Sequence, residues 1–145
     1  MSVGDPQGRR QAREAALQML YQIEVGKSGA PEAIATYWPA REPDEQLEEP
    51  LKEFANGLVG GAVSRREEID AMLGAHAQNW RVERMAIIDR LVLRLGVYEM
   101  LSEAETPSKV IINEALELAR SYSGEEAVAF VNGVLDAIRK ELRRS

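Results

Sequence analysis

Apolar residues between positions 84 and 101 cover nearly every side of the helix that this segment would form. Placed at about 100° per residue, they leave no wide polar face, which is typical of a helix enclosed by other helices. The pattern therefore predicts a central helix. Its apolar positions are Ile87, Ile88, Leu91, Val92, Leu93, Leu95, Val97, Tyr98 and Met100.

Four charged residues and one glycine interrupt this central segment. The charges are Asp89, Arg90, Arg94 and Glu99. None of them has an opposite charge three or four residues away inside the helix, so we expect their partners on other helices or on another chain. Gly96 is less favourable in a helix than Ala by roughly 1 kcal/mol. We interpret it as a point where a second helix crosses closely.

The rest of the chain also shows helical spacing, and no segment shows the alternation that is typical of a strand. Helices are expected over residues 9–25, within residues 30–40 where Pro39 ends the helix, over residues 50–73 and over residues 107–122, followed by a last helix after residue 124. A capping box at Ser64 and Glu67 either restarts the helix over residues 50–73 or leaves it continuous. The sequence thus predicts an all-α protein.

Two subdomains are expected in a compact bundle of about seven helices. Residues 9–79 form the first subdomain and residues 80–145 the second, and they join near Asn79. Residues 1–8 contain two glycines and a proline. They are predicted to form a flexible leader.

The composition narrows the class of protein. With 145 residues, of which 45% are hydrophobic and 29% charged, the chain is expected to form one soluble domain. It has no cysteine and no basic segment followed by an apolar run at its start. No apolar stretch reaches the roughly 20 residues that span a bilayer. We therefore expect a cytoplasmic protein without a membrane segment.

No arrangement of residues predicts catalysis, a metal or a cofactor. His76 is the only histidine, and a metal site around it would need several carboxylates. The acidic residues form no pattern of nucleophile and base, and the glycines form no phosphate-binding loop. The sequence therefore predicts a protein that is not an enzyme.

The net charge of −6 argues against a general nucleic-acid binder, but the charge is unevenly distributed. The first 13 residues hold three arginines and one acid, whereas residues 42–53 hold six acids and one lysine. Arg10, Arg13 and Tyr21 are predicted to share one exposed edge of the first helix. Arginines and an aromatic ring are the groups that bind single-stranded RNA, although an ordinary solvated helix face has the same pattern.

Four segments carry a specific resemblance to a known family. They are residues 9–14, 85–100, 106–115 and 130–136. All four are similar to segments of the NusB family of bacterial transcription antitermination factors, and they occur in that family's order. The resemblance implies the family's helical fold.

Two functional surfaces are implied by the resemblance. By helical pattern alone, the same positions also fit exposed helix faces, a packed ring and links between helices, so both interpretations stay open. The positions implied in RNA binding are Arg9, Arg10, Arg13, Tyr21, Lys109, Asn113, Glu126, Phe130 and Asn132. The positions implied in binding a partner protein are Asp89, Arg90 and Glu99.

The function implied by the resemblance is binding of boxA RNA together with the ribosomal protein NusE. This activity would support antitermination by RNA polymerase on ribosomal RNA operons. Two alternatives remain open at this point. One is an RNA-binding module related to the N-terminal domain of ribosomal RNA cytosine methyltransferases, and the other is a structural homodimeric bundle.

Overall fold

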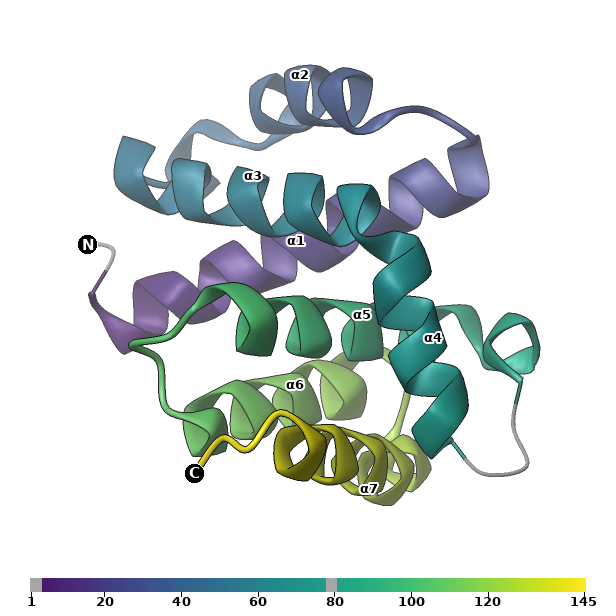
Figure 1. The fold of residues 1–145 in the computed structure, drawn as a ribbon. Helices are drawn as coiled ribbons and strands as arrows, with labels where there is room; N and C mark the ends of the chain where they lie inside the picture. Colours follow the sequence, from purple (N-terminus) through teal and green to yellow (C-terminus); the bar gives the residue numbers. More distant parts are fainter. Residues whose placement is uncertain (1–3, 78–80) are drawn as a thin grey trace. The chain divides into compact units, whose positions relative to one another are not determined.

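Helices make up the regular structure in the computed structural model, which describes residues 4–77 and 81–145. Within these residues there are seven α-helices, two short 3₁₀ helices and no strand (Figure 1). The all-α prediction is confirmed, while the predicted junction near Asn79 lies outside the described residues. The α-helices are α1 (Pro6–Gly26), α2 (Ala30–Ala40), α3 (Glu49–Ser64), α4 (Arg66–His76), α5 (Ile87–Ser102), α6 (Ser108–Tyr122) and α7 (Glu125–Glu141). The 3₁₀ helices are η1 (Pro43–Glu45) and η2 (Val82–Arg84).

Two compact units divide the chain, Met1–Val63 and Ser64–Ser145. The first contains α1 to α3, and the second contains α4 to α7. Helix α4 groups with the second unit because it packs on α5 and α7. The sequence had placed this helix in the first subdomain.

Helix α1 begins earlier than predicted. Asp5 is its N-cap, and the Asp5 carboxylate accepts a hydrogen bond from the backbone N–H of Gln7 at 3.2 Å. Pro6 occupies the start of the helix, where its fixed φ is favourable and its missing N–H has no intrahelical partner to lose. The flexible leader predicted for residues 1–8 is therefore wrong from Asp5 onward, and residues 1–3 lie outside the described residues.

An aromatic and amide cluster joins the elements of the first unit. The Trp38 indole N–H on α2 donates to the Asn56 side-chain oxygen on α3 at 2.8 Å. The Gln46 amide donates to the carbonyls of Trp38 and Arg41 at 2.7 and 3.0 Å. These bonds attach the segment between α2 and α3 to the end of α2.

Helix α5 lies at the centre of the second unit and packs against α4, α6 and α7. Every residue from 91 to 97 is buried, as the pattern of apolar positions predicted. A Cβ atom at Gly96 would lie 3.1 Å from both methyl carbons of Leu135 on α7. The prediction that Gly96 marks a close helix crossing is confirmed.

The interhelical partner expected for Arg94 lies on α4. The Arg94 guanidinium donates two hydrogen bonds to the Asp70 carboxylate, each 2.9 Å long. The Arg94 side chain is 9% exposed and that of Asp70 is 27% exposed. This bidentate pair therefore links α4 to α5 at the edge of the core.

The C-terminal segment holds the connection between α5 and α6. The Arg144 guanidinium donates to the carbonyl of Met100 and the hydroxyl of Ser108, both at 2.7 Å. It also donates to the carbonyls of Glu103 and Thr106. These bonds satisfy carbonyls near the end of α5 and fix the start of α6.

Candidate nucleic-acid interface

The arginines that were predicted to bind RNA lie on the first turns of helix α1, in the first unit. The Arg9 guanidinium lies over the ring of Phe54 on α3, with 4.1 Å between the guanidinium carbon and the ring centroid. The Arg13 guanidinium lies 5.6 Å from the same centroid. Arg10 is exposed. Phe54 cannot be recognised from the sequence as a functional residue, because its spacing fits the core face of its helix.

The exposed edge predicted for Arg10, Arg13 and Tyr21 is wrong as a continuous surface. Arg13 is only 5% exposed, and Leu17, one turn further along, is 1% exposed. Tyr21 is 41% exposed, but it lies roughly 16 Å from Arg10 along the helix axis. A prediction from a helical wheel places charged side chains on the face of the helix that is exposed to solvent. A long arginine stem can instead pack on apolar surface with its head over an aromatic ring.

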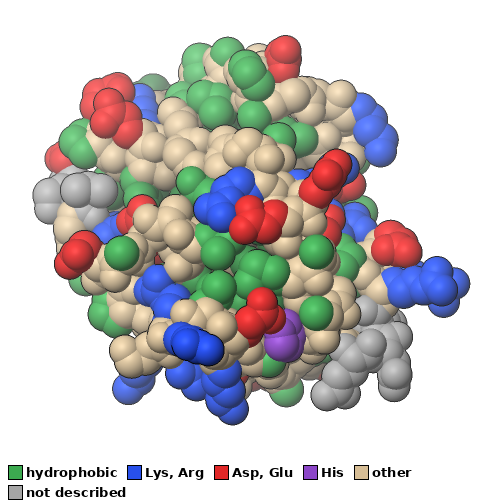
Figure 2. All heavy atoms as spheres, in the orientation of Figure 1, with side chains coloured by type: hydrophobic (Ala, Val, Ile, Leu, Met, Phe, Trp, Pro, Cys, Tyr) green, Lys and Arg blue, Asp and Glu red, His purple; other side chains and the backbone are tan. Residues whose placement is uncertain are grey.

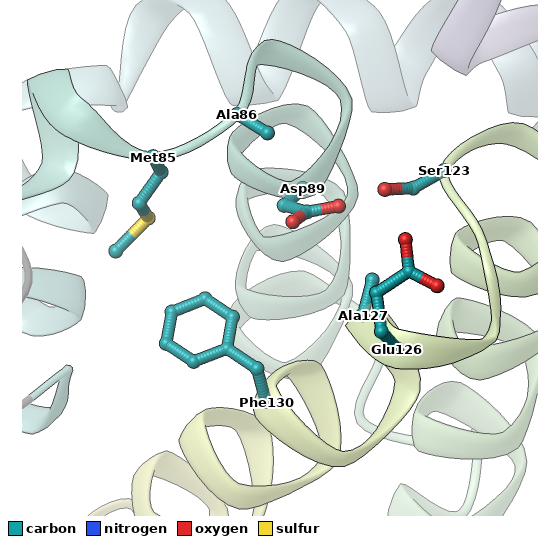
Figure 3. A pocket seen from close by; sticks show the side chains of 7 residues that line it. All are labelled: Met85, Ala86, Asp89, Ser123, Glu126, Ala127 and Phe130. Atoms are coloured by element: carbon teal, nitrogen blue, oxygen red, sulfur yellow. The ribbon is translucent and has the colours of Figure 1, made fainter.

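A pocket in the second unit joins residues that the resemblance had assigned to different surfaces. Its volume is about 460 Å³. Asp89 comes from the first turn of α5, and Glu126 and Phe130 come from α7 (Figure 3). The pocket is completed by Met85, Ala86, Ser123 and Ala127.

The pocket has a polar side and an apolar side. Asp89, Ser123 and Glu126 turn their oxygen atoms toward one side, and Met85 and Phe130 line the other (Figure 3). One carboxylate oxygen of Asp89 is buried without a hydrogen-bond partner among the described residues. Such a site favours a ligand that brings N–H donors and a flat apolar face. A nucleobase offers both, whereas a phosphate would be repelled by the carboxylates.

The turn before α7 places Glu126 at this pocket. Gly124 has a φ of 142°, in the region that favours glycine. A Cβ atom at Gly124 would lie 3.0 Å from both carboxylate oxygens of Glu126. Arg120 pairs with Glu125 across this turn at 2.9 Å, and with Glu117 on its own helix α6 at 2.6 Å. The hydrogen bond to Glu125, the charge of that carboxylate and the charge of Glu117 raise the pKa of Arg120 above its ordinary value.

The remaining predicted positions divide between exposed and buried. Lys109 and Asn113 are exposed near the start of α6, and Asn132 is exposed on α7. Arg90 is half-buried and donates to the carbonyl of Val82. Glu99 is only 3% exposed, which removes it from the surface predicted to meet a partner protein.

The electrostatic surface is mixed. On the face drawn in Figure 2, Lys and Arg side chains are interspersed with Asp and Glu side chains.

Among residues 4–77 and 81–145, no group of three or more His, Asp or Glu residues is placed to hold a metal ion. In the same part of the chain, no helix combines the length and the apolar character needed to cross a membrane.

Comparison with known proteins identifies close relatives. The model of the NusB family matches residues 10–140. The chain is 46% identical over 134 residues to the transcription antitermination protein NusB of Koribacter versatilis (strain Ellin345), covering 92% of this chain and 90% of that protein. It is 44% identical over 136 residues to the protein of that name from Myxococcus xanthus (strain DK1622), covering 94% and 97%.

Solved structures agree with the sequence relatives. NusB of T. maritima aligns with a TM-score of 0.81 and 32% identity, covering 92% of this chain and 91% of that chain. A chain from a crystal structure of antitermination factors NusB and NusE in complex with double-stranded RNA aligns with a TM-score of 0.83 and 29% identity. That alignment covers 93% of this chain and 98% of the other.

Proposed function

This chain belongs to the NusB family, and from that premise we propose that it is an RNA-binding transcription antitermination factor that acts with the ribosomal protein NusE. We further propose that the two proteins bind boxA RNA in the cytoplasm. They would thereby support RNA polymerase in an antitermination complex on ribosomal RNA operons. One similar solved chain is described with NusE and double-stranded RNA, which supports this choice of partners.

The observation that carries the proposal is the pocket with Asp89 and Glu126 on one side and Phe130 on the other. Two carboxylates accept hydrogen bonds from the amino and imino groups of a base, and a phenyl ring stacks on the face of that base. The same carboxylates repel phosphate, so the pocket suits an unpaired base in a single strand.

Residues outside the pocket bind the RNA backbone in this proposal. Arg9 and Arg10 on α1 neutralise phosphates, and Lys109, Asn113 and Asn132 extend the polar contacts in the second unit. The net charge of −6 gives the protein as a whole no electrostatic attraction for RNA phosphates, so its affinity for RNA alone is modest. NusE supplies the remaining contacts, and the linked surfaces bind more tightly than either one alone.

The test is a fluorescence titration of boxA RNA, with and without NusE, over a range of salt concentrations. Each phosphate contact to a single strand contributes about 0.7 to the slope of log K against log salt. We expect Arg10→Ala to weaken binding and to lower the slope by about this amount. Arg66→Ala is the matched control, because Arg66 is an exposed arginine in the first turn of α4. An equal effect of the two substitutions would contradict the proposal, as would wild-type protein that binds no RNA in the presence of NusE.

A homodimer is a further partner arrangement within the proposal. Mass measurement of the protein alone and with RNA tests it directly. A dimer that dissociates when RNA and NusE bind would mean that self-association covers the RNA surface. A monomer under all conditions would rule out the homodimer.

A further inference from the structure

Among the aromatic residues that the structure describes, Phe54 is the one with two arginines of another helix over its ring. The ring belongs to α3 and both guanidinium groups belong to α1, within the first unit. The guanidinium of Arg9 is 4.1 Å from the ring centroid, and that of Arg13 is 5.6 Å away. Both distances fall within the range of about 6 Å in which a cation is attracted to the face of a ring.

The two arginines differ in their access to a ligand. Arg13 is 5% exposed and acts as a fixed charge beneath the surface. Arg9 is half-buried, so part of its side chain reaches solvent. A guanidinium that rests on a ring keeps N–H donors at its edge, and these can still bond to an anionic oxygen.

Resting on a ring also changes the entropy of binding. An arginine side chain has several rotatable bonds, and a freely moving side chain loses conformational entropy when it binds a phosphate. A guanidinium that is already held over Phe54 loses less freedom at that step. A ring that holds a guanidinium in place can therefore raise the affinity for an anion without touching the anion itself.

We infer that Phe54 is a positioning residue, which holds the guanidinium of Arg9 in the orientation that meets the RNA backbone. This inference rests on the proposed function. It predicts a particular signature, because removing the ring interaction leaves the number of phosphate contacts unchanged. Affinity should fall equally at every salt concentration, whereas loss of Arg9 itself should also lower the salt slope by about 0.7.

The experiment replaces Phe54 in the full chain with a series of ring-fluorinated phenylalanines. Fluorine withdraws electrons from the ring face and weakens its attraction for a cation, while the ring keeps nearly the same size. Affinity for fluorescein-labelled boxA RNA is measured with NusE present, and thermal unfolding checks that the fold is retained. Phe54→Leu, which removes the ring, is the simpler companion variant.

We expect affinity to decrease stepwise with fluorination, to about fivefold weaker at the end of the series, with an unchanged salt slope. The same series in an Arg9→Ala background should show little further loss. In the free protein, the NMR signal of the Arg9 side-chain N–H should lose its ring-current shift and gain mobility in Phe54→Leu.

Two results would overturn the inference while leaving the proposed function intact. One is unchanged RNA affinity throughout the fluorinated series, together with weakened binding by Arg9→Ala. The other is a change in salt slope on fluorination, which would mean that the ring affects the phosphate contacts themselves. If the unmodified chain binds no RNA even with NusE, the proposed function fails first, and the positioning role falls with it.

Discussion

Replacing Gly96 with Ala tests the crossing of α5 and α7 directly. The added Cβ atom would lie 3.1 Å from each methyl carbon of Leu135, whereas carbon atoms prefer a separation of about 3.5–4.0 Å. Leu135 is 0% exposed, so it has little room to withdraw. Overpacking of this kind costs about 1–3 kcal/mol, and the better helix propensity of Ala returns about 1 kcal/mol. We expect a net loss of about 1 kcal/mol in the free energy of unfolding.

A double-mutant cycle with Leu135→Ala separates the two contributions. Truncating Leu135 alone costs about 2–5 kcal/mol because it leaves a cavity. In that background the new methyl group has space, so Gly96→Ala should stabilise the fold by up to about 1 kcal/mol. The substitution at Gly96 therefore changes sign between the two backgrounds, which corresponds to a coupling energy of about 2 kcal/mol.

The assay is urea unfolding followed by circular dichroism, with the slope m checked for constancy among the variants. Gly74→Ala on α4 is the control, since a Cβ atom there meets nothing within 4 Å. It should stabilise the protein by about 1 kcal/mol in both backgrounds. If Gly96→Ala has the same effect with and without the Leu135 side chain, to within about 0.5 kcal/mol, the reasoning about a close crossing is refuted.

Three further predictions concern the ion pairs and the C-terminal segment. Asp70→Asn should lower the free energy of unfolding by about 2 kcal/mol, because a neutral amide replaces the carboxylate that accepts two hydrogen bonds from the buried Arg94 guanidinium. Chemical denaturation measures this, and a change below about 0.5 kcal/mol would contradict it. Arg144→Ala should speed amide hydrogen exchange between α5 and α6 while leaving α1 unchanged, whereas equal protection in both proteins would show that its hydrogen bonds are dispensable. The hydrogen bond from Arg139 is the main cause that holds the pKa of Asp136 below its ordinary value of 3.8. The stability that this pair adds is therefore present above pH 3.8 and is lost as the pH falls through the lowered pKa. NMR titration should show the pKa of Asp136 rising toward 3.8 in Arg139→Gln, and an unmoved pKa would exclude that cause.

Local signals predicted some helix limits well and others poorly. The helix expected within residues 30–40 begins at Ala30, directly after Gly29, but it continues through Pro39 to Ala40 instead of ending at Pro39. The start of α1 was placed too late. The flexible leader predicted for residues 1–8 includes Asp5 and Pro6, although an acidic N-cap followed by proline is a helix-starting signal.

The candidate site was only partly accessible from the sequence. Glu126 and Phe130 were proposed from resemblance, and Asp89 was assigned to a different surface. The fold brings all three to one pocket. Met85 and Ser123 line the same pocket from the segments before α5 and after α6, and nothing in the sequence marks these two segments as neighbours. Convergence of this kind depends on how α5 and α7 pack.

That the chain is helical and that residues 91–97 are enclosed could be predicted without the structure. Helical periodicity is a local property, repeated every few residues, and it can be read without knowing any neighbour. The burial of Arg13 beside Phe54 and the pairing of Arg94 with Asp70 depend instead on how the helices pack. The surroundings of a long charged side chain are set by the helix that packs against it, and that helix comes from a distant part of the chain.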